Sequence, residues 1–199
     1  MLASGSGTIL EAMLQAGVEV ALVASDRPCR GLDVARNANV TTRLVDRLEF
    51  GGFRPTFDRE AYSVELARVL KDDRIDLVAM SGFGTIVTSA FHEAFPGRVL
   101  NTHPSLLPDF PGWHAVAATL KAGVSESGCT VHVATEALDD GPILARRRVK
   151  VYPSDDESSL HERIKTVERV LYPVVVARVM ASLAEGREPE SVAGTMEES

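Results

Sequence analysis

The chain has 199 residues, of which 45% are hydrophobic and 25% charged, and its formal net charge is −7. This composition is typical of a globular domain with a sizeable core and not of a disordered or fibrous chain, and the acidic balance argues against a broad nucleic-acid or anionic-membrane surface. Two widely separated cysteines, apolar runs too short to span a bilayer and a start without a basic segment lead us to expect a cytoplasmic protein without disulfides.

Apolar runs alternate with helical patterns along the chain, which predicts an α/β fold with an open, mostly parallel twisted sheet and helices on both faces. Helices are predicted over 8–16, over 59–71 after a cap at Asp58, and from a capping sequence at 154–157 to 184 with a kink at Pro173. The predicted strands cover residues 18–24, 41–45, 75–80, 99–102, 130–134 and 143–151. One domain is expected over residues 1–186, followed by a disordered tail over 187–199, which is polar and aperiodic.

A glycine-rich turn, Ser4-Gly5-Ser6-Gly7-Thr8, stands directly before the first predicted helix. Glycines let the backbone point its amides at an anion, and the helix N-terminus adds a partial positive charge, so a phosphate is the expected guest. A dinucleotide fingerprint is disfavoured, because Leu10 stands where the third glycine belongs. The alternative is a sharp strand-to-helix turn without a ligand.

Asn101 and His103 end a predicted strand within the sequence N-T-H-P-S-L-L-P. Residues two apart on a strand point to the same side, so the amide and the imidazole can converge on one atom. The amide offers N–H donors to a developing oxyanion, and the histidine can move a proton near neutral pH. The alternative is a histidine with a structural role at a strand end.

Further polar residues are weaker candidates. The turn Asp139-Asp140-Gly141-Pro142 could bring a carboxylate to His103, although it is also an ordinary turn sequence. The positive charge of Arg59, in the first turn of a helix, is unfavourable next to the helix dipole, which suggests that Arg59 binds an anion. The alternative is a surface arginine without a ligand. We expect no metal site, because an offset of three along a strand sends Cys129 and His132 to opposite faces.

These motifs resemble the phosphoribosylglycinamide formyltransferase family, the folate-dependent enzymes of purine synthesis, over nearly the whole chain. The most specific stretches are N-T-H-P-S-L-L-P-x-F-P-G at 101–112, T-V-H-V-A-T at 130–135 and L-D-D-G-P-I at 138–143. The resemblance implies a Rossmann-like formyltransferase fold and direct formyl transfer from 10-formyltetrahydrofolate, as cosubstrate, to the amine of glycinamide ribonucleotide, without a metal. It also implies a protein that acts on small molecules, binds neither nucleic acid nor membrane, and is a monomer or homodimer.

The resemblance also assigns roles to residues. Asn101, His103 and Asp139 fall on the catalytic positions, where Asn101 and His103 stabilise a tetrahedral intermediate and Asp139 tunes His103. The residues that fall on the ribonucleotide site are Gly5, Gly7, Thr8, Ile9 and Glu168. The residues that fall on the folate site are Arg59, Gly84, Thr85, Ile86, Val87, Asn101, Thr135, Leu138 and Asp139.

The chain departs from the family pattern at three places. The first strand is cut to about residues 1–3 and is expected to be short or frayed. Gly84-Thr85 stands where the family usually has Met-Arg, which removes side chains near the folate. Ile9 replaces a usual asparagine, so that only its backbone amide can serve the phosphate.

Other functions remain open on the sequence. A formyltetrahydrofolate hydrolase shares the Asn, His and Asp arrangement but passes the formyl group to water, and a methionyl-tRNA formyltransferase needs a basic RNA surface and a further domain. A non-catalytic ribonucleotide- or folate-binding module is the alternative of a different class.

Overall fold

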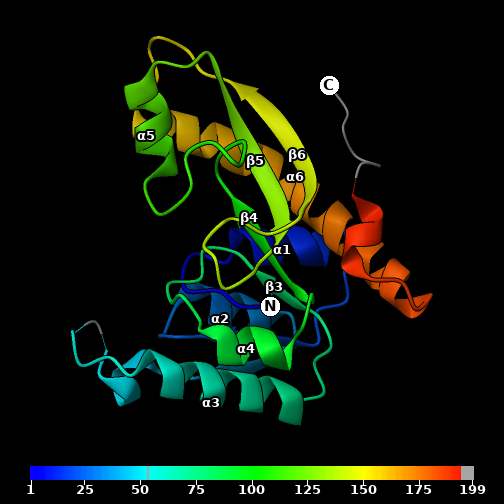
Figure 1. Cartoon of the computed structure of the whole chain (residues 1–199). Coiled ribbons are helices and arrows are strands. Elements are labelled where there is room, and N and C mark those ends of the chain that lie inside the picture. Colours follow the sequence, from blue (N-terminus) through cyan, green and yellow to red (C-terminus); the bar gives the residue numbers. More distant parts are fainter. Residues whose placement is uncertain (53, 194–199) are drawn as a thin grey trace. The chain divides into compact units, whose positions relative to one another are not determined.

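The computed structural model describes residues 1–52 and 54–193 (Figure 1). These described residues fall into two compact units, divided between Val99 and Leu100, which are called unit 1 and unit 2. A single domain over residues 1–186 was expected from the sequence, and that expectation spans both units. No helix in the described ranges is long and apolar enough to cross a membrane.

Unit 1 is built on parallel strands. In chain order its elements are α1 (Thr8–Gln15), β1 (Leu22–Ser25), α2 (Arg30–Asn37), β2 (Thr41–Leu44), the 3-10 helix η1 (Arg47–Phe50), α3 (Arg59–Asp72), β3 (Val78–Met80) and α4 (Ser89–Ala94). β1 pairs in parallel with β2, and the fully buried Leu2 forms parallel bridges to both Ala24 of β1 and Met80 of β3. The strand at the chain start is therefore short, as predicted, but hydrogen-bonded on both sides.

Unit 2 is built on antiparallel strands covered by a long helix. Its elements are β4 (Val99–His103), α5 (Ala115–Ala122), β5 (Glu126–Val133), β6 (Ile143–Lys150), α6 (Glu157–Ala184) and the 3-10 helix η2 (Pro189–Val192). β4 pairs antiparallel with β5, and β5 pairs antiparallel with β6. The predicted α/β fold is confirmed, with parallel pairing in unit 1 and antiparallel pairing in unit 2. α6 packs on β5 and β6 (Figure 1).

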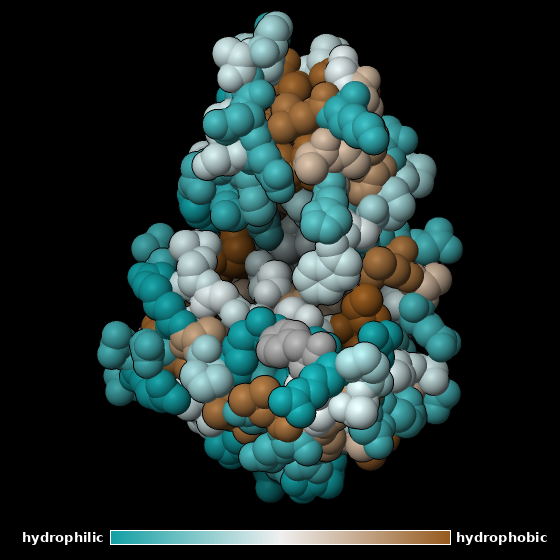
Figure 2. All heavy atoms as spheres, turned by 90° about the vertical axis from the view of Figure 1, so that its left-hand side faces the viewer, coloured by the Kyte–Doolittle hydropathy of each residue, from teal (hydrophilic) through white to brown (hydrophobic). Residues whose placement is uncertain are grey.

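Each unit has its own apolar core. In unit 1, α1, β1 and α2 contribute Leu10, Val23, Leu32 and Ala35, none more than 2% exposed. In unit 2, Tyr172 of α6 is fully buried and donates a hydrogen bond to the Leu100 carbonyl oxygen at 3.0 Å. This bond connects the long helix to the strand that carries Asn101 and His103. The face drawn in Figure 2 is largely hydrophilic, with hydrophobic side chains gathered in separate patches.

The helix ends follow the local sequence. Asp58 caps α3, because its Oδ1 accepts the Ala61 amide at 2.9 Å, as the sequence predicted. The capping box of α6 is formed by Asp156 and Ser159, and the helix continues through the buried Pro173 to Ala184. In the tail expected to be disordered, η2 is formed and buries Pro189 and Val192, whereas residues 194–199 lie outside the described part.

Candidate active site

Strand β4 carries Asn101 and His103 to one side of the unit 2 sheet. Their spacing of two places both side chains on one face, as predicted. His103 is 6% exposed and Asn101 is half-buried, so the imidazole is held in a mostly dry environment at the strand end. Both residues are therefore fixed by a hydrogen-bonded strand.

Both ring nitrogens of His103 face oxygen acceptors. Nε2 lies 2.9 Å from the carbonyl oxygen of Phe110, and Nδ1 lies 3.3 Å from Oδ2 of Asp139. A neutral imidazole has one N–H and can donate to only one of these oxygens, whereas the imidazolium donates to both. The two oxygen atoms, one on each side of the ring, fix the orientation of the imidazole.

Asp139 is fixed in the turn between β5 and β6. Its backbone is in the left-handed region with φ of 57°, a conformation that aspartate tolerates better than most residues. Its side chain is 4% exposed, and Oδ2 accepts the Gly112 amide at 2.8 Å. The carboxylate is thus held at His103 by the turn on one side and by the Gly112 amide on the other.

His132 of β5 is a member of this cluster that the sequence did not assign to the site. It stands directly opposite Asn101 in the β4–β5 register, and its Nε2 lies 3.3 Å from Nδ2 of Asn101 and 3.6 Å from Oδ1 of Asp139. Burial lowers the pKa of His132 below its usual value, which favours the neutral ring. With Nδ1 donating to the Val133 carbonyl at 3.1 Å, Nε2 is left to accept from Asn101.

A signal for His132 was present in the sequence, in the motif T-V-H-V-A-T. From its spacing, this histidine was predicted only not to form a metal site with Cys129. Among the described residues, no group of three or more histidine, cysteine, aspartate and glutamate side chains is arranged to hold a metal ion.

The glycine loop of unit 1 ends at the N-terminus of α1. Gly7 is the N-cap with φ of 74°, and a Cβ there would lie 2.8 Å from the Cα of Gly31, so both the conformation and the close approach require glycine. Among the residues that the structure describes, no side chain caps this helix end, which leaves backbone amides of the first turn available to an anion. Ile9 is buried, so its side chain is not available to a ligand at this loop.

The loop is also held from α2. The Gly31 amide donates to the Gly5 carbonyl oxygen at 3.0 Å, and Nη1 of Arg30 donates to the Ser6 carbonyl oxygen at 2.5 Å. Arg30 also pairs with Glu11 of α1 at 2.6 Å. The conformation of the loop is therefore imposed by two helices.

The remaining predicted residues are placed as follows. Glu168 is half-buried on α6, and its charge adds to the burial that raises the pKa of Cys129 to about 12. Thr135 and Leu138 are exposed in the turn before β6, and Arg59 is exposed at the start of α3. In unit 1, Gly84 and Thr85 connect to the glycine loop through Ser4, whose Oγ accepts the Gly84 amide at 2.6 Å. Ile86 and Val87 continue that segment.

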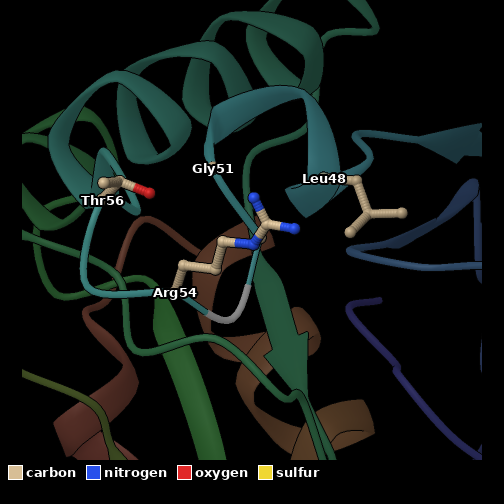
Figure 3. A pocket seen from close by; sticks show the side chains of 5 residues that line it. Leu48, Gly51, Arg54 and Thr56 are labelled. Atoms are coloured by element: carbon tan, nitrogen blue, oxygen red, sulfur yellow. The ribbon is translucent and has the colours of Figure 1, made fainter.

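A hollow of about 420 Å³ lies in unit 1 (Figure 3). The described residues that line it are Leu48, Gly51, Gly52, Arg54 and Thr56. None of these five was predicted as a site residue. The polar clusters that bear on chemistry are instead the His103 group of unit 2 and the glycine loop with its neighbours in unit 1.

Comparison with known proteins shows which family the sequence matches. Residues 1–176 match the family described as "Formyl transferase". A phosphoribosylglycinamide formyltransferase of Mycobacterium tuberculosis is 43% identical over 185 residues, covering 89% of this chain and 82% of the relative. That of Escherichia coli is 34% identical over 184 residues, with 89% and 84% covered.

Solved structures of proteins with these names are similar to this chain in fold. Glycinamide ribonucleotide transformylase 1 from Symbiobacterium toebii is similar with a TM-score of 0.79 and 38% identity, covering 86% of this chain and 82% of that one. Phosphoribosylglycinamide formyltransferase from Streptococcus pneumoniae gives a TM-score of 0.82 at 31% identity, with 90% and 96% covered. The likeness extends over both sequence and fold.

Proposed function

The chain belongs to the formyl transferase family, and from that premise we propose that it transfers the formyl group of 10-formyltetrahydrofolate to the amine of glycinamide ribonucleotide. The observation that carries the proposal is the buried cluster of Asn101, His103, His132 and Asp139, which lies within the part of the chain matched to the family. Relatives named phosphoribosylglycinamide formyltransferase, one of them 43% identical, support the choice of substrate.

In the proposed reaction the amine nitrogen attacks the formyl carbon, and the carbonyl oxygen becomes an oxyanion. Asn101 would donate one N–H of its amide to this oxyanion, while His132 holds the other through Nε2. The N–H of His103 Nε2, which donates to Phe110 in the structure, would change its partner to the oxyanion. Asn101 and His103 would thus share the negative charge that develops in the transition state.

Asp139 would act through His103. Its carboxylate, 3.3 Å from Nδ1, orients the ring and would stabilise the positive charge of the protonated ring while Nε2 donates a hydrogen bond to the formyl oxygen. When the intermediate collapses, the proton lost by the amine goes to the folate nitrogen whose bond to the formyl carbon breaks. A carboxylate beside the reacting atoms is suited to organising a water for that transfer.

The substrate sites are proposed from the resemblance together with the geometry of each unit. The glycine loop, with Gly5, Gly7, Thr8 and Ile9, would bind the ribonucleotide phosphate by its backbone amides, and the half-buried Glu168 would meet the substrate's amine end. For the folate we propose the residues Arg59, Gly84, Thr85, Ile86, Val87, Asn101, Thr135, Leu138 and Asp139. We also predict that the protein acts in the cytoplasm, that it acts on small molecules alone, and that it is a monomer or homodimer.

The test is folate deformylation by the purified protein, followed spectroscopically with 10-formyltetrahydrofolate in the presence and absence of glycinamide ribonucleotide. Turnover that depends on the ribonucleotide would support the transferase. Turnover without it would favour the hydrolase, which shares the same catalytic residue types. Binding of either ligand without any turnover would favour a binding module.

A further inference from the structure

The Gly84–Thr85 pair of unit 1 is held by polar side chains from three other segments of that unit. The Gly84 amide donates to Ser4 Oγ at 2.6 Å, and Nη1 of Arg47 donates to the Gly84 carbonyl oxygen and to Thr85 Oγ1, each at 3.2 Å. Thr85 Oγ1 in turn donates to Oδ2 of Asp26 at 2.8 Å. The backbone amide and carbonyl of Gly84 and the Thr85 hydroxyl are therefore all fixed.

Asp26 is the centre of this arrangement. It is fully buried, and Arg27 donates to both of its carboxylate oxygens, from Nε to Oδ1 and from Nη2 to Oδ2, each at 2.9 Å. Burial alone would raise the pKa of Asp26, but hydrogen bonds from Arg27, Ser4 and Thr85 hold it below the usual value. A buried carboxylate of this kind stays charged and binds its donors strongly.

The absence of a side chain at position 84 has a steric cause. A Cβ on Gly84 would lie 2.2 Å from Nη2 and 3.0 Å from Cζ of Arg27, and 3.1 Å from Oδ2 of Asp26. The end of an arginine is ordinarily flexible, but this guanidinium is tied to a buried carboxylate by two hydrogen bonds. It occupies the volume that any side chain at position 84 would need.

We propose that Asp26 and Arg27 are positioning residues for the formyl donor, which hold the Gly84–Thr85 backbone in the conformation that the folate requires. This inference rests on the proposed function, which puts Gly84 and Thr85 in the folate site. Gly84 and Thr85 stand where the family usually has Met-Arg. In the structure, the charged pair of Asp26 and Arg27, from a distant part of the sequence, takes the place of the side chains that are absent there. The Gly84–Thr85 backbone is thereby held in place, where the sequence alone suggested a loss of side-chain contacts.

The first test removes one hydroxyl. Thr85→Val keeps the shape of the side chain but loses its hydrogen bonds to Asp26 and Arg47. We expect the Kd for 10-formyltetrahydrofolate, measured by calorimetry without ribonucleotide, and the KM for it to rise about tenfold. The value of kcat should stay within about twofold, and the KM for the ribonucleotide should not change.

Thr88→Val is the matched control. The Thr88 hydroxyl is buried, and within the described ranges it has no hydrogen-bond partner, so the same substitution three residues later removes no bond. The control should bind folate as the wild type does. If Thr85→Val and Thr88→Val have equal Kd values, or if Thr85→Val lowers only the unfolding temperature, the positioning role is overturned.

The second test uses the steric relation between positions 84 and 27. Gly84→Ala should raise the folate Kd about tenfold, because its methyl group displaces the guanidinium of Arg27. Arg27→Lys keeps the charge but withdraws Nη2, so the double variant should bind folate at least about threefold more tightly than Gly84→Ala alone. Independent, additive effects of the two changes would overturn the inference.

Measurements on the wild type separate this inference from the proposed function. Turnover that depends on the ribonucleotide, combined with weak folate binding by Thr85→Val, supports both. If the wild type binds folate but does not transfer its formyl group to the ribonucleotide, the proposed function fails while the variant Kd values still decide the inference. If the wild type does not bind folate, the inference is overturned as well.

Discussion

Replacement of His132 by its two amide analogues tests whether this buried ring orients Asn101. A glutamine amide reaches about as far as Nε2 of the histidine, and an asparagine amide reaches about as far as Nδ1. His132→Gln can therefore keep the acceptor that lies 3.3 Å from Asn101 Nδ2, while His132→Asn keeps only the donor to the Val133 carbonyl. We expect the asparagine variant to be the slower enzyme.

The magnitude of this effect can be bounded. Loss of one neutral hydrogen bond costs about 1 kcal/mol, or about fivefold in rate if it acts wholly in the transition state. Complete loss of an oxyanion donor costs roughly 100-fold to 1000-fold. Since His132→Asn misorients Asn101 without removing it, kcat should fall by about 5-fold to 100-fold, and that of His132→Gln by less than about fivefold.

The assay is kcat for ribonucleotide-dependent deformylation, with folate Kd and urea unfolding measured on the same preparations. Equal kcat values for the two variants, or a faster asparagine variant, would refute an orienting role through Nε2, provided that both variants are folded and bind folate.

Three other variants test separate parts of the structure. Asp139→Asn keeps the shape but removes the charge beside His103, so kcat should fall at least about 100-fold across the pH range with a smaller change in KM, as steady-state kinetics will report. Tyr172→Phe should lower the free energy of unfolding by about 1 kcal/mol in urea titrations, because the buried Leu100 carbonyl loses its donor. The folded-state pKa of Asp26 lies below its unfolded value of 3.8, so the unfolded chain takes up the proton first. The stabilisation by Asp26 is therefore complete well above pH 3.8 and is lost as the pH falls through the folded pKa, and denaturant titrations should show a weaker acid dependence for Asp26→Asn.

Local signals predicted the long helices well. The cap at Asp58 and the apolar spacing after it predicted α3 to within one residue at its C-terminal end. The start of α6 was predicted from a capping box at 154–157, whereas the box is formed by Asp156 and Ser159 and the helix begins at Glu157. The helices α2, α4 and α5 were not predicted as elements. The strands were found, but β1 and β3 are shorter than their apolar runs.

Parts of the candidate site depend on pairings between distant segments, and these could not be predicted from local pattern. Asn101 and His103 were found because their spacing of two is a local property of one strand. The role of His132 depends on the register that places it opposite Asn101, which periodicity alone does not specify. The close approach of Arg27 to Gly84 likewise forms only when the chain folds. From the sequence alone, the glycine therefore indicated only that side chains near the folate were missing.

The hydroxyl of Ser4 links two of the proposed substrate sites, because Ser4 belongs to the glycine loop and its Oγ accepts a hydrogen bond from the Gly84 amide. If the loop binds the ribonucleotide phosphate and Gly84 borders the folate, as proposed, then each substrate changes the affinity of the other by the same factor, since the free energy of the ternary complex does not depend on the order of binding. Where that factor strengthens binding, the enzyme holds its formyl donor more tightly once the acceptor is present. Such reciprocity would protect the donor from wasteful loss of its formyl group to water.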